Sequence, residues 1–112
     1  MASRVHQPLE DAEFDFVLAM AGTPVLAYFC GTWPKALAAT RAMDTVVREA
    51  AREYGTRLTV VRADMTRCPA ATRRFAVTSS PWLVLVGDGE VIASRAGALD
   101  GVQLGEFLAA HL

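Results

Sequence analysis

Apolar residues follow two different patterns along the chain, and each pattern predicts one kind of element. Uninterrupted apolar runs are typical of strands covered on both faces, and Val25–Cys30 is the clearest of them. Apolar residues that recur every three or four positions are typical of amphipathic helices, and Lys35–Tyr54 is the longest such stretch. The same patterns predict further strands at Arg4–Gln7, Leu58–Ala63, Trp82–Val86 and Glu90–Ala96. They predict further helices at Glu10–Met20, Pro69–Phe75 and Gln103–Leu112.

The order of these elements predicts the fold class. The long helix between Val25–Cys30 and Leu58–Ala63 makes a βαβ unit, in which the two strands are parallel and the crossover is right-handed. The short turn Gly87-Asp88-Gly89 joins the last two strands and predicts an antiparallel hairpin. The chain is therefore expected to be one α/β domain over residues 1–112, with the order βαβαβαββα. Its central sheet should be mixed, have about five strands and carry helices on both faces.

Composition and charge narrow the range of partners. Hydrophobic residues make up 53% of the 112 residues, which is enough for a real core. Eleven Lys and Arg against 12 Asp and Glu give a net charge of -1, so we expect no nucleic acid and no membrane surface as partner. The N-terminus has no apolar run after Arg4, and no stretch is long and apolar enough to span a bilayer. We therefore expect a cytoplasmic protein.

Metal and cofactor chemistry finds no support in the sequence. His6 and His111 lie at opposite ends of the chain, and no Cys or His spacing suggests zinc. There is no Gly-rich phosphate loop and no Ser-His-Asp set. We therefore expect neither a metal site nor a cofactor.

A series of residues lies in register with one known family. The series is densest in the second half, where it includes Pro81, Gly89-Glu90-Val91 and Gly97-Ala98-Leu99. In the first half it includes Pro24-Val25-Leu26 and Trp33. With this spacing, the chain resembles the thioredoxin family over nearly its whole length. The resemblance implies the thioredoxin fold, and it says less about function, which depends on the site.

The resemblance fails where thioredoxins carry their active site, Trp-Cys-Gly-Pro-Cys-Lys. Here Trp33 is followed by Pro34-Lys35-Ala36-Leu37, so Pro34 and Leu37 hold the two cysteine positions. Counting backward from the end of the long helix, which is three residues longer than usual in the family, Leu37 and Thr40 hold them instead. Disulfide exchange needs two sulfur atoms, and no other side chain replaces them. The usual reductase activity should therefore be absent.

Two further family positions differ. The buried Asp that assists thiol exchange in thioredoxins corresponds to Tyr28, and the buried Lys corresponds to Arg62.

The resemblance also implies a peptide-binding groove. The proline that corresponds to Pro81 follows a cis peptide bond in this family, and the main chain of the preceding residue, here Ser80, pairs with an extended segment. The rest of the groove corresponds to Trp33, Pro34, Ala96 and Gly97. An alternative stays open, in which Pro81 and Gly97 only shape the fold.

The two cysteines, Cys30 and Cys68, are the candidate catalytic residues. Cys68 directly precedes Pro69 at a predicted helix N-terminus, which favours an anion and predicts a lowered thiol pKa. Both residues follow neighbouring parallel strands, so a Cys30–Cys68 disulfide is geometrically allowed if their Cα atoms lie within about 7 Å. The alternative is that Cys30 fills a small buried space and Cys68 is an incidental thiol.

Three functions remain open at this stage. The preferred one is a redox-inactive thioredoxin-like domain, not an enzyme, that binds a protein partner or extended peptide through the groove around Trp33, Ser80 and Pro81. The second is an atypical thiol-disulfide oxidoreductase that uses Cys30, Cys68 or both. The third is a structural subunit of a larger enzyme assembly.

Overall fold

The computed structural model describes residues 5–112, and Arg4 of the first predicted strand lies outside them. The strands are β1 Val5–His6, β2 Val25–Cys30, β3 Thr59–Asp64, β4 Trp82–Gly87 and β5 Glu90–Ala96. The helices are α1 Asp11–Met20, α2 Leu37–Tyr54, α3 Pro69–Arg74 and α4 Gly101–His111, with 3₁₀ turns η1 Pro34–Ala36 and η2 Gly55–Arg57. Within residues 5–112, no helix is both long enough and apolar enough to cross a membrane.

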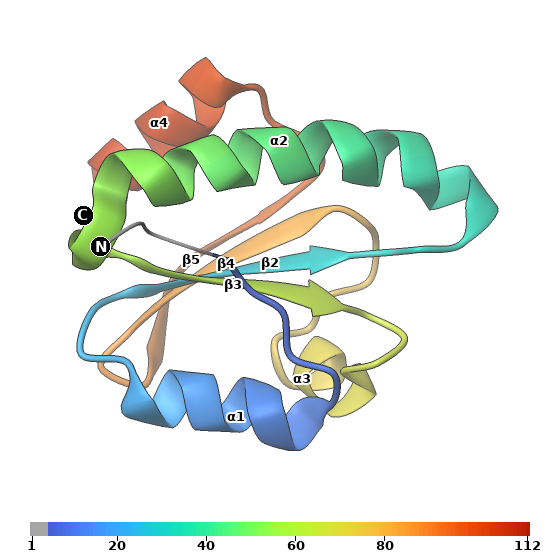
Figure 1. The fold of residues 1–112 in the computed structure, drawn as a ribbon, viewed down its shortest axis with the longest axis horizontal. Coiled ribbons are helices and arrows are strands. Elements are labelled where there is room, and N and C mark those ends of the chain that lie inside the picture. Colours follow the sequence, from blue (N-terminus) through green and yellow to red (C-terminus); the bar gives the residue numbers. More distant parts are fainter. Residues whose placement is uncertain (1–4) are drawn as a thin grey trace.

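The five strands form one mixed sheet in the order β1-β3-β2-β4-β5. β3 pairs in parallel with both β1 and β2, whereas β4 is antiparallel to β2 and β5 is antiparallel to β4. Helices α2 and α4 cover one face of the sheet, and α1 and α3 cover the other (Figure 1). The α/β fold class, the parallel half and the hairpin half predicted from the sequence are therefore confirmed.

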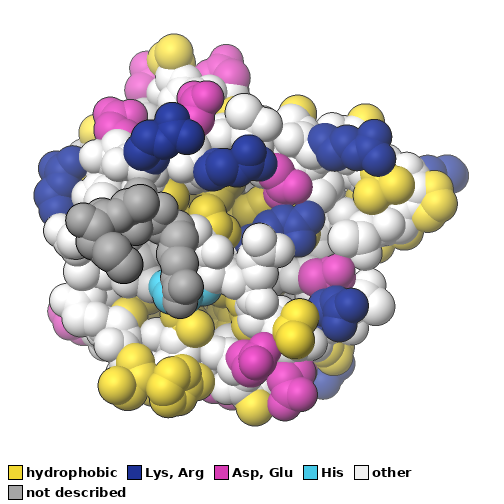
Figure 2. Space-filling model, in the orientation of Figure 1, with side chains coloured by type: hydrophobic (Ala, Val, Ile, Leu, Met, Phe, Trp, Pro, Cys, Tyr) yellow, Lys and Arg dark blue, Asp and Glu magenta, His cyan; other side chains and the backbone are white. Residues whose placement is uncertain are grey.

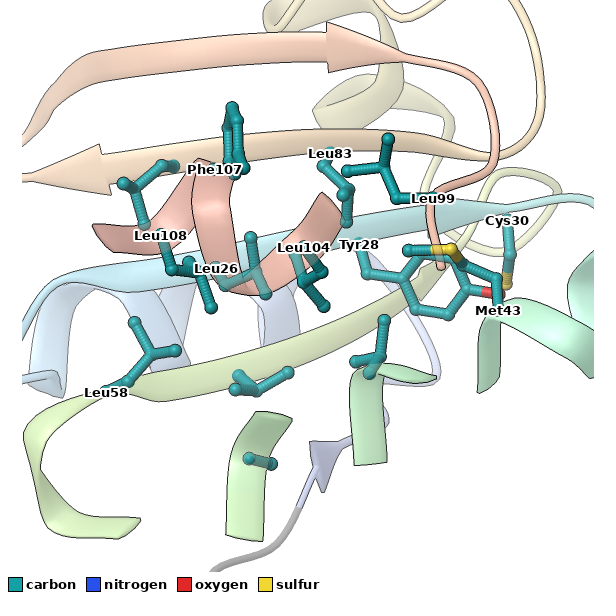
Figure 3. Packing of buried hydrophobic residues seen from close by; sticks show 14 residues of the cluster. Leu26, Tyr28, Cys30, Met43, Leu58, Leu83, Leu99, Leu104, Phe107 and Leu108 are labelled. Atoms are coloured by element: carbon teal, nitrogen blue, oxygen red, sulfur yellow. The ribbon is translucent and has the colours of Figure 1, made fainter. Parts of the chain in front are cut away.

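Strand β2 lies at the centre of this arrangement, and all six of its residues are buried. Successive side chains of a strand point to opposite faces. Leu26, Tyr28 and Cys30 accordingly pack under α2 and α4 (Figure 3), whereas Ala27 and Phe29 pack against α1 and α3. The prediction of a strand covered on both faces is confirmed.

Helix α1 begins one residue after the predicted start, at Asp11, and two other helices begin two residues away from the starts that the apolar pattern predicts. Helix α2 begins at Leu37 instead of Lys35, because Pro34–Ala36 form a 3₁₀ turn first. Helix α4 begins at Gly101 instead of Gln103, because Asp100 caps it. The Asp100 carboxylate accepts a hydrogen bond from the Gln103 main-chain N–H at 2.8 Å, and the Gln103 side chain accepts one from the Asp100 N–H at 3.0 Å. Gly101 and Val102 are exposed, so no apolar periodicity marks this first turn.

The cap at Asp100 should contribute measurably to stability. We expect Asp100→Ala to lower the free energy of unfolding by about 1 kcal/mol, because it leaves helix N–H groups unsatisfied. Chemical denaturation followed by circular dichroism measures this. Glu106→Ala is the control, since Glu106 is exposed in the same helix, and it should change stability by less than about 0.5 kcal/mol. Equal effects of the two substitutions would contradict a stabilising cap.

Candidate functional site

The loop after β2 presents a tryptophan at the carboxyl end of the central strand. The Trp33 side chain is 43% exposed, although it is a large hydrophobic residue. Its indole ring packs directly over Gly31: a Cβ atom at Gly31 would lie only 2.4 to 2.7 Å from three ring atoms. Gly31 therefore permits the ring to lie flat against the loop, and any larger residue would displace it.

The chain around Ser80 lies beside this loop. The Ser80–Pro81 peptide bond is cis. The Gly31 main-chain N–H donates a hydrogen bond to Ser80 Oγ at 2.7 Å, and the Gly97 N–H donates one to the Pro81 carbonyl at 2.9 Å. Gly97 has a φ of 95°, in the region that favours glycine. These bonds tie the Trp33 loop, the Ser80–Pro81 segment and the end of β5 into one surface.

The structure thus brings together most of the groove residues that the sequence suggested. Pro34 begins the 3₁₀ turn next to Trp33 and is exposed. Ala96 is the last residue of β5, where it pairs with Trp82 of β4, and it is exposed as well. Within residues 5–112, no protein group bonds to the main-chain N–H or C=O of Ser80. An extended segment that passes Ser80 would therefore find both of these groups available.

Thr40, which the backward count from the end of the long helix placed at a cysteine position of the family, makes a contact that sequence reasoning missed. Its hydroxyl donates a hydrogen bond to the Gly31 carbonyl at 2.7 Å, and its side chain lies on the buried side of α2. The Gly31 carbonyl is thus held by Thr40 of α2, and the Gly31 N–H is held by Ser80. The available signal was a polar residue on the inward side of the long helix.

A polar cluster of Tyr28, Asp44 and Arg62 lies behind the loop. The Arg62 guanidinium donates to the Asp44 carboxylate at 2.9 Å, and the Tyr28 hydroxyl lies 3.0 Å from the same oxygen. Burial is the main cause that raises the pKa of Tyr28, and the hydrogen bond to Asp44 is the main cause that raises the pKa of Arg62. Near neutral pH the phenol therefore keeps its proton and the guanidinium keeps its charge. Neither group is suited to move a proton for thiol chemistry.

Asp44 is the second residue that sequence reasoning missed. The resemblance placed Tyr28 where thioredoxins carry a buried carboxylate. In this chain the nearby carboxylate comes from α2, where Asp44 lies one helical turn after Thr40. The apolar pattern of α2 did not indicate that Asp44 pairs with Arg62, because Arg62 lies on another element, 18 residues away.

The two thiols are poor nucleophiles where they lie. Both side chains are fully buried, and burial is the main cause that raises the pKa of Cys30 and that of Cys68 to about 11. The expectation of a lowered pKa for Cys68 is therefore wrong. Besides burial, the Asp11 carboxylate already occupies the N-terminus of α3, where it accepts hydrogen bonds from the N–H groups of Ala70 and Ala71 at 3.1 and 2.8 Å.

The two cysteines also pack on different faces of the sheet. Cys30 points toward Met43 and α2 (Figure 3), whereas Cys68 belongs to the cluster around Phe14 and Ala71. Both are free thiols. The disulfide that the sequence allowed is therefore not formed in this structure. Burial of Cys30 agrees with the alternative in which it fills space in the core.

Comparison with known proteins agrees with this geometry. The family model for thioredoxin matches residues 5–110. The chain belongs to the thioredoxin family. It is 29% identical to a thioredoxin of Haemophilus influenzae over 104 residues, which cover 93% of this chain and 94% of that protein. It is 31% identical to thioredoxin C-2 of Corynebacterium nephridii over 98 residues, 88% of each chain. A thioredoxin-like protein of Synechocystis is 30% identical over 104 residues, 93% of each chain.

Membership of the thioredoxin family agrees with the observed fold of the chain. The chain contains no Cys-x-x-Cys sequence, and the segment Trp33-Pro34-Lys35-Ala36-Leu37 contains no cysteine. Both cysteines of the chain lie elsewhere, at positions 30 and 68.

Proposed function

We propose that this member of the thioredoxin family does not exchange disulfides and binds a protein partner, as an extended peptide segment, in the groove formed by Trp33, Pro34, Ser80, Pro81, Ala96 and Gly97. The observation that carries the proposal is the Ser80 main chain, which has no protein partner in the described structure and lies next to a half-exposed indole.

The physical basis is strand addition. An extended peptide gains affinity from main-chain hydrogen bonds to an available N–H and C=O, and gains specificity from side-chain contacts beside them. Ser80 offers the two main-chain groups. Trp33 offers a large apolar surface, and tryptophan is one of the residues that most often dominate binding energy. The Gly31 bonds to Ser80 and Thr40 hold this surface in place before a partner arrives.

The state of the thiols supports the absence of redox activity. Exchange begins with attack by a thiolate on an accessible disulfide. Cys30 and Cys68 are fully buried, and with a pKa of about 11 each thiol keeps its proton at neutral pH. The names of the relatives favour the alternative, an atypical oxidoreductase that uses Cys30 or Cys68. That alternative requires a reductase activity that Cys30→Ser or Cys68→Ser abolishes.

A peptide selection tests the binding proposal. A displayed library of linear, cysteine-free peptides is selected against the full chain, and the affinity of the best peptide is measured by isothermal titration calorimetry. We expect Trp33→Ala to weaken this affinity about tenfold and to leave the fold intact by circular dichroism. Val102→Ala is the matched control, because Val102 is a more exposed apolar residue on α4, and it should leave the affinity unchanged.

Two results would contradict the proposal. One is a selected peptide that binds the Trp33→Ala variant as tightly as the unmodified protein. The other is reduction of insulin disulfides faster than dithiothreitol alone, with the extra rate lost in a Cys30→Ser or Cys68→Ser variant that still folds.

A further inference from the structure

Helix α1 carries apolar side chains on two sides, and only one of them is covered. Phe14 is fully buried and Val17 packs against the same core. On the other side Phe16 and Met20 are 65% and 69% exposed, and Leu9 just before the helix is 63% exposed. A helix that is apolar all round is normally buried all round. Within residues 5–112, nothing covers this second side of α1.

A groove runs along the uncovered side. It has a volume of about 790 Å³ and lies between α1 and the edge strand β1. Ala12, Phe16 and Met20 form its helical wall, and the residues from Val5 to Pro8 form the opposite wall. Figure 2 shows hydrophobic side chains gathered on this face along α1, the lowest helix in Figure 1. None of its lining residues belongs to the Trp33 groove.

The charged residues around this groove indicate which kind of partner can bind there. Residues 9–21 contain four acidic residues and no Lys or Arg. Asp11 caps α3 and Asp15 pairs with Arg74, whereas Glu13 lines the groove and accepts a hydrogen bond from the Leu9 main-chain N–H. Among the described residues, no Lys or Arg lines the groove. A symmetric second copy would bring equal acidic charges together, and an anionic membrane surface would be repelled.

We propose that the groove between α1 and β1 is the docking site for an amphipathic helix of a partner protein. The apolar stripe of that helix covers Phe16 and Met20, and its Lys and Arg residues lie along the acidic side at Glu13. Such helix-in-groove recognition uses apolar anchors spaced three or four residues apart. The ten residues of α1 extend over about 15 Å, which matches two to three turns of a bound helix.

Two synthetic helical peptides test this proposal on the full chain. Both carry the same leucine stripe, and their flanking positions are lysine in one and glutamate in the other. We expect the lysine peptide to bind, and the glutamate peptide to bind about tenfold more weakly or not at all. The double variant Phe16→Ser/Met20→Ser should lose about tenfold in affinity for the lysine peptide. Val102→Ser and Trp33→Ala should keep the full affinity, which separates this site from the Trp33 groove.

A second measurement does not depend on any variant. Chemical-shift changes on adding the lysine peptide to the ¹⁵N-labelled protein should cluster on α1 and on residues 5–8. Equal binding of the two peptides, shifts elsewhere, or an affinity unchanged by the double serine substitution would overturn the proposal. A dimer in sedimentation experiments that the double serine variant abolishes would also overturn it, because the occupant would then be a second copy.

Discussion

The native protein should react with iodoacetamide at least about a hundredfold more slowly than the unfolded chain at the same pH. The pKa of both thiols is raised from 9.0 to about 11, so at neutral pH the thiolate is about a hundredfold scarcer in the folded state. Full burial of Cys30 and Cys68 adds a steric barrier that the reagent passes only when the structure opens. Alkylation followed by mass spectrometry, with and without guanidinium chloride, measures both rates and counts the modified thiols.

The same pKa values predict how stability changes with pH. A group whose pKa is raised in the folded state stabilises fully below its unfolded pKa, and this contribution is lost as the pH rises toward the folded value. Between pH 9 and 11 each thiol should therefore lower the free energy of unfolding by about 1 kcal/mol per pH unit. The difference in slope between the natural chain and a Cys30→Ala/Cys68→Ala variant isolates this contribution from other groups that titrate there.

Two findings would contradict this description of the thiols. Rapid modification of Cys68 in the native protein at neutral pH would show an accessible thiolate at the start of α3. A reversible Cys30–Cys68 disulfide in protein purified without reductant would show that the two sulfur atoms can meet, although the side chains pack on opposite faces of the sheet. Either result would restore the oxidoreductase alternative.

Asp44→Ala should destabilise the fold by about 2 kcal/mol. The substitution removes the only ion-pair partner that Arg62 has among residues 5–112, and it removes one acceptor of the Tyr28 hydroxyl. The Arg62 side chain is 22% exposed, so water restores part of the loss, and the cost stays below that of a fully buried pair. Urea denaturation of the two proteins measures the difference.

Two variants test whether the stability lost in Asp44→Ala comes from the cluster of Tyr28, Asp44 and Arg62. Asp15→Ala removes a carboxylate whose pair with Arg74 is more than half exposed, so it should cost less than about 0.5 kcal/mol. Asp44→Ala combined with Arg62→Met removes both charges and should recover part of the stability lost in Asp44→Ala. A cost for Asp44→Ala no larger than that for Asp15→Ala would show that the cluster does not stabilise the fold.

Local sequence patterns predicted most of the architecture, because strands and helices impose short periods on the residues that they bury. The apolar run Val25–Cys30 predicted a strand covered on both faces, and the structure buries all six residues. The turn Gly87-Asp88-Gly89 predicted the hairpin of β4 and β5. The start of α4 was missed because its cap depends on one side chain, Asp100, and not on any periodicity.

The chemistry of the site depended on contacts between distant residues. From the sequence alone, Cys68 was a candidate for a lowered thiol pKa at a helix start, beside the alternative that it is an incidental thiol. In the structure the Asp11 carboxylate, about 60 residues earlier, already binds that helix end, and the core buries the sulfur.

The sequence by itself determined the fold and the absence of a Cys-x-x-Cys sequence, since both are properties of residue order. Only the tertiary structure decided that Cys30 and Cys68 pack on opposite faces, that Asp44 pairs with Arg62, and that none of residues 5–112 covers one side of α1. The reason is physical: periodicity records which side of an element is apolar, whereas the partner that meets each side is set by how the elements pack.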